Sequence, residues 1–174
     1  MSRKKNLSTD QRRALLATPA GWLACGFGSG LTPVAQGTSG SLAALLPWLL
    51  LRQLPLMLYV VVLVVGFVVG VWACNVAGRA LGVADHRSVV WDEFIGQWIA
   101  LLPLLIPAWL PSGGFAWWMP AAGFALFRLF DVWKPWPISW LDRHLKGGMG
   151  VMVDDVVAGI FAAVVLMLGL HALR

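Results

Sequence analysis

The sequence reads LMLYVVVLVVGFVVGVWACNV from Leu56 to Val76, and these residues include no charged side chain. An α-helix needs about 20 predominantly apolar residues to cross the hydrocarbon core of a bilayer, and this run reaches that length. Residues 153–170 form a second apolar run, in which the only charged residues stand at the beginning. We therefore predict a membrane-spanning helix in each of the two regions.

The whole chain shares this apolar character. It has 174 residues, of which 59% are apolar and 12% are charged, and its mean hydropathy is +0.77. Soluble domains carry roughly 25% charged residues, so this chain has too few to cover a surface in water. The composition excludes a soluble globular domain, a disordered chain and a disulfide-rich secreted module. The length suggests one domain.

Three further apolar segments lie between the two long runs or before them, at residues 41–51, 92–110 and 115–130. The first is short, roughly 17 Å as an α-helix. The second contains Pro103 and Pro107. We expect an all-α fold, a polytopic integral membrane helical bundle with about five membrane segments.

The basic residues indicate the orientation of this bundle. If the helix of residues 56–76 ends near Arg79 on one face of the membrane, segments 92–110 and 153–170 begin on that face and segment 115–130 ends on it. That face then carries most of the Lys and Arg residues, and only Arg52 and Arg174 lie on the other face. The positive-inside rule makes the basic side cytoplasmic. Residues 1–20 are then a basic cytoplasmic tail, and residues 21–174 form a single transmembrane domain. An arrangement with four spans and a re-entrant segment 41–51 is the alternative, and it would place the tail outside.

The net charge of +5 does not indicate a nucleic-acid partner. Five of the 13 basic residues lie within the first 13 positions, and the chain has neither a basic stripe nor a nucleic-acid-binding motif. A tail that flanks the membrane explains this distribution better. Cys25 and Cys74 have the spacing of neither a metal site nor a disulfide framework, and we expect both to be small buried residues.

Acidic residues stand at three predicted helix ends on the cytoplasmic side. Seven of the eight lie between residues 85 and 155. Those at helix N-termini are favoured there by the helix dipole, so capping is an alternative explanation for them. Asp131 stands at the C-terminal end of its segment, where the dipole disfavours an anion, so it needs Arg128, Lys134 or a metal ion nearby.

Convergence of these ends predicts a metal site with phosphate chemistry. Carboxylates without nearby thiolates suit Mg²⁺ or Mn²⁺ better than Zn²⁺. Four basic residues on the same side are candidates to bind phosphate and to balance its charge: Arg128, Lys134, Arg143 and Lys146. A metal with carboxylates and basic residues indicates phosphoryl transfer or hydrolysis. The predicted metal ligands and catalytic residues are Asp92, Glu93, Asp131, Asp154 and Asp155.

A glycine-rich stretch precedes segment 41–51. Helix N-termini with exposed backbone N–H groups bind anions, and glycine permits close approach. We therefore expect Gly37, Thr38 and Ser41 to contact the substrate phosphate. The stretch is not a P-loop, because it has no GxxxxGK[ST] motif. Glycine clusters of this kind also occur as simple turns.

Four strings resemble the phosphatidylglycerophosphatase A family: GFGSGLTPVAQGTSGSLAAL (residues 26–45), VVWDEFIGQWIAL (89–101), FRLFDVWKPWPI (127–138) and GGMGVMVDDVVAGI (147–160). The resemblance covers about residues 21–170. Gln36 departs from the family, which commonly has Pro at this position.

The resemblance implies a Mg²⁺-dependent lipid phosphatase of the bacterial inner membrane. It would hydrolyse phosphatidylglycerophosphate to phosphatidylglycerol and phosphate at the cytoplasmic face, with a phospholipid substrate and the bilayer as its partners. The oligomeric state stays open. The family's signature positions include the five carboxylates named above and the basic residues Arg128 and Lys134.

Other functions and mechanisms remain as alternatives. A CDP-alcohol phosphotransferase also uses Asp-held divalent ions, but its motif is absent from this chain. A small transporter or channel with an acidic vestibule is the non-enzymatic alternative. Within the phosphatase reading, attack by water competes with a route through an aspartyl-phosphate intermediate.

Overall fold

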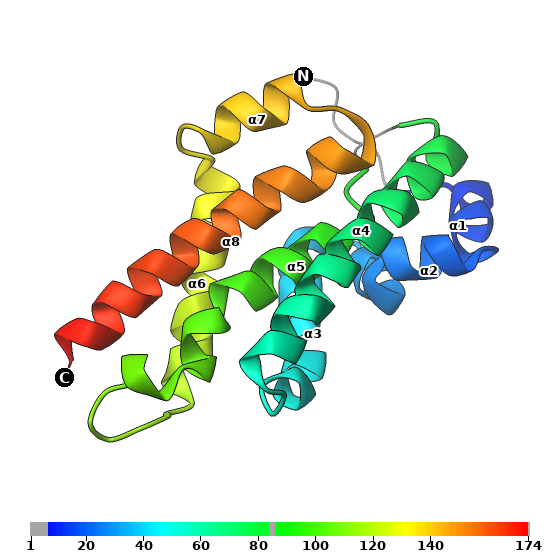
Figure 1. Cartoon of the computed structure of the whole chain (residues 1–174). Helices are drawn as coiled ribbons and strands as arrows, with labels where there is room; N and C mark the ends of the chain where they lie inside the picture. The colour runs from blue at the N-terminus through cyan, green and yellow to red at the C-terminus, as the bar shows by residue number, and fades with distance from the viewer. Residues whose placement is uncertain (1–6, 84–85, 174) are drawn as a thin grey trace.

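The computed structural model describes residues 7–83 and 86–173 (Figure 1). Within these residues the fold is all-helical, with eight α-helices, three short 3-10 helices and no strand. Asp85, one of the acidic residues counted above, and the basic residues of positions 1–6 lie outside the described residues.

The N-terminal region packs on the rest of the fold. Helix α1 (Thr9–Leu16) begins with a capping box between Ser8 and Gln11, and α2 (Pro19–Ala24) begins after the N-cap Thr18. A 3-10 helix, η1 (Gly26–Leu31), follows. Helix α1 packs against α2 and α4, so part of the expected tail belongs to the ordered fold.

Two helices are long and apolar enough to cross a membrane: α4 (Leu56–Leu81) and α8 (Gly147–Ala172). Helix α4 begins after Pro55 and ends at Gly82, which adopts the left-handed conformation common after a helix C-terminus. Large apolar side chains cover one side of α4, and Val64 and Val68 are 58% and 61% exposed. Such a surface is stable in lipid and unfavourable in water.

The remaining predicted segments are shorter. Helix α3 (Gln36–Leu51) and α6 (Trp118–Trp133) have 16 residues each. The expected continuous segment 92–110 is wrong, because α5 (Trp91–Ala100) has only 10 residues, about 15 Å. The chain continues as two 3-10 turns, η2 (Leu102–Leu105) and η3 (Pro107–Trp109). Each turn begins with or contains a proline, which removes a backbone donor and prevents the α-helix from continuing.

Helix α8 is central to the arrangement. It packs against α4, α5, α6 and the short helix α7 (Ile138–His144), and Figure 1 shows it running past α5 and α6 toward the C-terminus. The side-chain amide oxygen of Asn75 on α4 accepts a hydrogen bond from the Gly148 N–H at the start of α8 (2.8 Å). A Cβ atom on Gly148 would overlap the carbonyl oxygen of Val71. The beginning of α8 is therefore fixed against the last turns of α4.

Helices α5 and α8 cross at backbone contact. A Cβ atom on Gly159 would overlap the carbonyl oxygen of Gly96, and a Cβ atom on Gly96 would lie 2.8 Å from the carbonyl oxygen of Asp155. Small residues permit this close approach between helices. Glu93 and Asp155 each lie about one turn before the crossing on their own helix, so the crossing brings them together.

Aromatic side chains fix α5 between α3 and α4. The indole N–H of Trp91 donates to the carbonyl oxygen of Gly66 on α4 (2.9 Å), and that of Trp98 donates to Ala44 on α3 (2.8 Å). The hydroxyl of Tyr59 donates to the carbonyl oxygen of Trp98 (2.6 Å). These bonds satisfy buried polar groups and set the rotation of α5. Cys25 and Cys74 are both buried, as predicted.

Candidate metal and phosphate site

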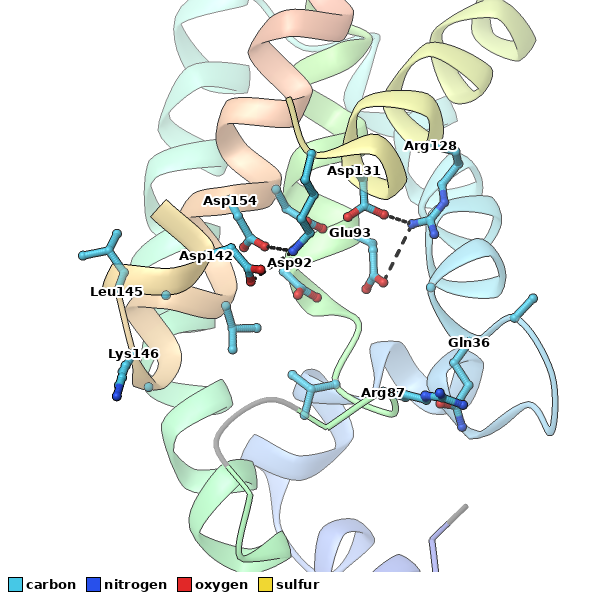
Figure 2. Close-up of a pocket in the computed structure, with 18 of the residues that line it drawn as sticks. Gln36, Arg87, Asp92, Glu93, Arg128, Asp131, Asp142, Leu145, Lys146 and Asp154 are labelled. Atoms are coloured by element: carbon cyan, nitrogen blue, oxygen red, sulfur yellow. Dashed lines mark hydrogen bonds and ion pairs between the residues drawn. The ribbon is translucent and has the colours of Figure 1, made fainter. Parts of the chain in front are cut away.

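One pocket of about 610 Å³ contains all five predicted carboxylates (Figure 2). They come from the first turn of α5, the last turn of α6, and the interior of α8. The expectation that Asp154 and Asp155 open their helix is wrong, because α8 already begins at Gly147, about two turns earlier, so capping does not explain them. These segments are distant in sequence, and the packing described above places them together. The lining carboxylates on these helices are Asp92, Glu93, Asp131, Asp154 and Asp155.

Three of these residues form a compact acidic triad: Asp92, Glu93 and Asp155. One carboxylate oxygen from each lies within 4.8 Å of those of the other two. Asp155 is 4% exposed. Charges of one sign so close together, and so far from water, repel one another strongly unless they are protonated or share a cation.

The donor set fits a hard divalent cation. Asp92 Oδ1, Glu93 Oε2 and Asp155 Oδ2 are buried and have no hydrogen-bond partner among the described residues. Buried polar atoms of this kind are rare unless a ligand satisfies them. Mg²⁺ takes oxygen ligands at about 2.1 Å, so its ligands lie about 3.0–4.2 Å apart, which is compatible with triad oxygens that all lie within 4.8 Å of one another. The triad is therefore the candidate metal site.

Arg128 connects α6 to the triad and to α3. Its Nη1 lies 2.6 Å from Asp131 Oδ2 and 3.9 Å from Glu93 Oε1. The same nitrogen donates a hydrogen bond to Ser41 Oγ (3.3 Å), and the Ser41 hydroxyl donates to the carbonyl oxygen of Gly37 (3.0 Å). Asp131, which the helix dipole disfavours at this position, thus has the cation that it needs.

Lys134 lies on the other side of the pocket. It ends α6 in a left-handed conformation (φ 45°), and its Nζ forms ion pairs with Asp154 and, at 3.1 Å, with Asp142 Oδ1 on α7. Burial alone would lower the pKa of Lys134, but the two carboxylates outweigh this effect and raise its pKa above the ordinary value for lysine. Lys134 is therefore a permanent positive charge at neutral pH.

The residues predicted to contact phosphate lie at different places. Gly37 lines the pocket, and a Cβ atom there would overlap Glu93 Oε1 and lie 3.1 Å from the Arg128 guanidinium. Ser41 is buried behind Arg128 and does not line the pocket. Thr38 does not line it either. Of the three, Gly37 is the one with direct access to a ligand.

Several polar residues near the site were not in the predicted set. Gln36 and Arg87 line the pocket. Gln97, about one turn after Glu93, is fully buried, and neither of its amide atoms has a hydrogen-bond partner among the described residues. Gln36 lies in the motif of residues 26–45 and Gln97 in the motif of residues 89–101. A polar residue within a largely apolar motif could have indicated that both lie near the site.

The fold and the pocket define a class of protein: an all-helical chain with two helices able to span a membrane and a buried carboxylate site flanked by Arg and Lys. A family model described as Phosphatidylglycerophosphatase A matches residues 22–170. The chain therefore belongs to the phosphatidylglycerophosphatase A family.

Named relatives agree with this assignment. Phosphatidylglycerophosphatase A of Escherichia coli (strain K12) is 49% identical over 154 residues, 88% of this chain and 85% of the relative. The protein of the same name from Haemophilus influenzae is 42% identical over 89% of this chain and 91% of its own length. A protein of Bacteroides thetaiotaomicron, provisionally named phosphatidylinositol-3-phosphatase, is 40% identical over 81% of this chain and 87% of its own. No solved structure matches the chain.

Proposed function

We propose that this chain hydrolyses the terminal phosphomonoester of phosphatidylglycerophosphate and releases phosphatidylglycerol and inorganic phosphate. Membership of the family and the names of its relatives support this substrate. The observation that carries the chemistry is the acidic triad of Asp92, Glu93 and Asp155 in a pocket that Arg128 and Lys134 also line. A phosphate monoester bridges such a site, because its oxygens bind both a metal ion and the basic residues.

The triad is the proposed Mg²⁺ site. Its buried oxygens lack partners among the described residues and are of the type that Mg²⁺ prefers. When bound, Mg²⁺ would polarise the phosphoryl group and favour attack by water. The sequence led us to expect Asp131 and Asp154 as ligands too. Since both are already paired with cations, we propose that they hold Arg128 and Lys134 in position.

Arg128 and Lys134 stabilise charge on the transferring phosphoryl group. Arg128 lies on α6 and Lys134 is the residue that ends it, and both line the pocket that contains the acidic triad. Figure 2 shows Arg128 beside Asp131 and Glu93. Fixed cations aimed at developing negative charge lower the barrier without reorganising during the reaction. Gly37 leaves room for Glu93 and Arg128, and its backbone N–H lies in the first turn of α3, where anions are favoured. Ser41 accepts a hydrogen bond from Arg128 and so positions the guanidinium.

We also propose that the pocket faces the cytoplasm in a bacterial inner membrane, with α3, α5 and α6 embedded beside the spans α4 and α8. Arg79 and Arg87 follow the C-terminal end of α4, whereas Arg52 lies before its beginning. The basic end of α4 is therefore the pocket end, and the positive-inside rule places it inside. The acyl chains of the substrate stay in the inner leaflet while its headgroup enters the pocket.

Phosphate release from defined lipids tests the activity. Purified protein in detergent micelles with phosphatidylglycerophosphate should release phosphate in the presence of Mg²⁺. Treatment with EDTA should stop the reaction, and added Mg²⁺ should restore it. Phosphatidylglycerol, which has no monoester, should release none. Absence of release from phosphatidylglycerophosphate with Mg²⁺ present would overturn the proposed function.

Labelling of introduced cysteines tests the orientation. Gly113→Cys lies in the loop before α6, where a side chain has open space, and His144→Cys lies at the exposed end of α7 near the pocket. In intact spheroplasts a membrane-impermeant maleimide should label position 113 and should reach position 144 only after permeabilisation. The reverse pattern would place the pocket outside. The parent chain, whose two cysteines are buried, provides the background.

A further inference from the structure

The pocket is larger than the reacting group requires. Its volume of about 610 Å³ lies within the roughly 300–1,000 Å³ range of pockets that hold drug-sized ligands. A phosphomonoester between the triad, Arg128 and Lys134 occupies one part of it. Figure 2 shows Gln36 and Arg87 together at one edge and Lys146 at another. A larger part of the headgroup has room to bind beside the reacting phosphate.

Arg87 is a basic residue of this pocket that has no ion-pair partner among residues 7–83 and 86–173. The guanidinium of Arg128 is paired with Asp131, and Lys134 is paired with Asp154 and Asp142. Among the described residues, the side chain of Arg87 makes neither a hydrogen bond nor an ion pair. An arginine in this state is well suited to an anion, since its guanidinium donates in parallel to two phosphate oxygens.

The turn that carries Arg87 is held in a defined place. The N–H of Val89 donates to the carbonyl oxygen of His86 (2.8 Å), and the N–H of Ser88 donates to the His86 ring (3.2 Å). The side-chain amide of Gln36 donates to Ser88 Oγ (3.3 Å) and so ties the turn to the beginning of α3. This arrangement limits the positions that the guanidinium can reach and reduces the entropy lost when it binds a ligand.

The side-chain amide oxygen of Gln36 is a hydrogen-bond acceptor that a ligand could use. Its Oε1 is buried and has no hydrogen-bond partner among the described residues, although its Nε2 is engaged with Ser88. A buried amide oxygen without a donor is unfavourable, so a ligand hydroxyl in this place would stabilise it. Arg87 and Gln36 together therefore present a donor pair for an anion beside an acceptor for a hydroxyl.

We propose that Arg87 and Gln36 form a second subsite, which binds the internal phosphodiester and the neighbouring glycerol hydroxyl of the lipid headgroup. This subsite rests on the proposed function. It would favour lipids in which a polyol separates the reacting monoester from a diester phosphate. A phosphomonoester attached directly to diacylglycerol lacks both groups and gains nothing from the subsite.

Kinetics of Arg87→Gln test the proposal. We expect KM for phosphatidylglycerophosphate to rise about tenfold, the effect of one charge-assisted hydrogen bond, while kcat changes less than about twofold. Arg87→Lys, which keeps the charge and loses the parallel donors, should raise KM less. Gln36→Ala should raise KM about threefold. Arg79→Gln removes a charge from an exposed residue that does not line the pocket, and it should leave KM unchanged.

Product inhibition separates the two phosphates. Phosphatidylglycerol carries the diester without the monoester, so its inhibition constant should rise about tenfold in Arg87→Gln. The inhibition constant of inorganic phosphate, which competes at the triad, should not change. If Arg87→Gln weakens both inhibitors equally or neither, or lowers kcat instead of raising KM, the subsite is refuted. A wild-type protein that does not cleave phosphatidylglycerophosphate would refute the proposed function, and the subsite with it.

Discussion

Two halves of one pocket treat the same chemical group in opposite ways. Asp131 and Asp154 each contact a cation of this chain, Arg128 and Lys134. The triad of Asp92, Glu93 and Asp155 has buried oxygens without partners among the described residues. The charges of the first half are balanced as folded, because each carboxylate lies beside a cation, although Asp154 Oδ1 has no hydrogen-bond partner among the described residues. The second half needs a cation from outside, since close carboxylates in a medium of low dielectric constant repel each other strongly.

The contrast shows that carboxylates in one pocket have different roles, depending on which charges lie beside them. In the proposed mechanism, Asp131 and Asp154 hold basic side chains where a phosphate can meet them. The triad, of which only Glu93 has an ion-pair partner among the described residues, would bind the metal. A count of acidic residues cannot distinguish these roles. The position of each neighbouring cation distinguishes these roles. We therefore expect substitutions in the two halves to have effects of different size.

Removal of a charge from the triad should have the largest effect. Asp155→Asn and Asp92→Asn keep the shape of the side chain and remove an oxygen ligand with its charge. We expect kcat to fall about 10³-fold, because a metal ion contributes several kcal/mol to stabilisation of the transition state. Phosphate release at saturating Mg²⁺ measures this effect.

Asp142→Asn is the matched control for these variants. Asp142 also lines the pocket and pairs with Lys134, but its side chain is 46% exposed and it lies outside the triad. We expect it to lose less than about threefold, as exposed ion pairs contribute about 1 kcal/mol or less. Equal losses at positions 142 and 155 would remove the distinction between the two halves.

Loss of the cation from the paired half should have the second largest effect. Lys134→Met leaves Asp154, whose side chain is 8% exposed, without its partner. Breaking a buried pair costs about 3–5 kcal/mol, and we expect about 2 here because Lys134 is 30% exposed. In thermal unfolding in detergent, this corresponds to a fall in Tm of about 4–8 °C. The double variant Lys134→Met/Asp154→Asn should recover part of that loss.

The pH dependence of the Tm difference between wild type and Lys134→Met follows from the raised pKa of Lys134. A raised pKa in the folded state means that the stabilisation is fully present below the unfolded pKa, about 10.4, and is lost only as the pH rises through the folded value. The Tm difference between wild type and Lys134→Met should therefore stay constant from about pH 7 to about pH 9.5. A difference that vanishes between these values would show that the pair is not formed.

A methyl group at Gly37 should have the smallest effect of the three. Its Cβ atom would overlap Glu93 Oε1 and press on Arg128, so it disturbs the contact between the two halves without removing a charge. We expect Gly37→Ala to lower kcat about tenfold through misplacement of these groups, with little change in Tm. Gly169→Ala on α8, where a Cβ atom meets open space, is the control and should behave as wild type.

Part of this fold can be predicted from the sequence, because apolar runs and charged residues indicate where some of the helices lie. Helices α4 and α8 follow from long apolar runs, and the carboxylates at the ends of α5 and α6 follow from the points where other apolar segments begin or end. The first two turns of α8, which place Asp154 and Asp155 inside the helix, were not foreseen. The break after Ala100 was missed, although Pro103 and Pro107 were noted. Proline weakens a helix, but whether the chain then bends or only kinks depends on what packs around it.

The partners of the charges were harder to foresee. The spacing of three residues made both Arg128 and Lys134 candidates for Asp131, and Arg128 does pair with it. Lys134 does not, because it adopts a left-handed conformation that ends α6 and turns its side chain toward Asp154 on α8. Local spacing applies only while the helix continues.

The amino-acid sequence sets the helical class, the two helices that are long and apolar enough to span a membrane, and the family. These properties arise from short-range patterns, since hydropathy and charge act residue by residue on partition between lipid and water. The acidic triad depends instead on backbone contact between Gly96 and Gly159, two residues on helices far apart in the chain. Which carboxylates remain without a cation is decided by that packing, because electrostatic interactions depend on distances that no linear pattern contains.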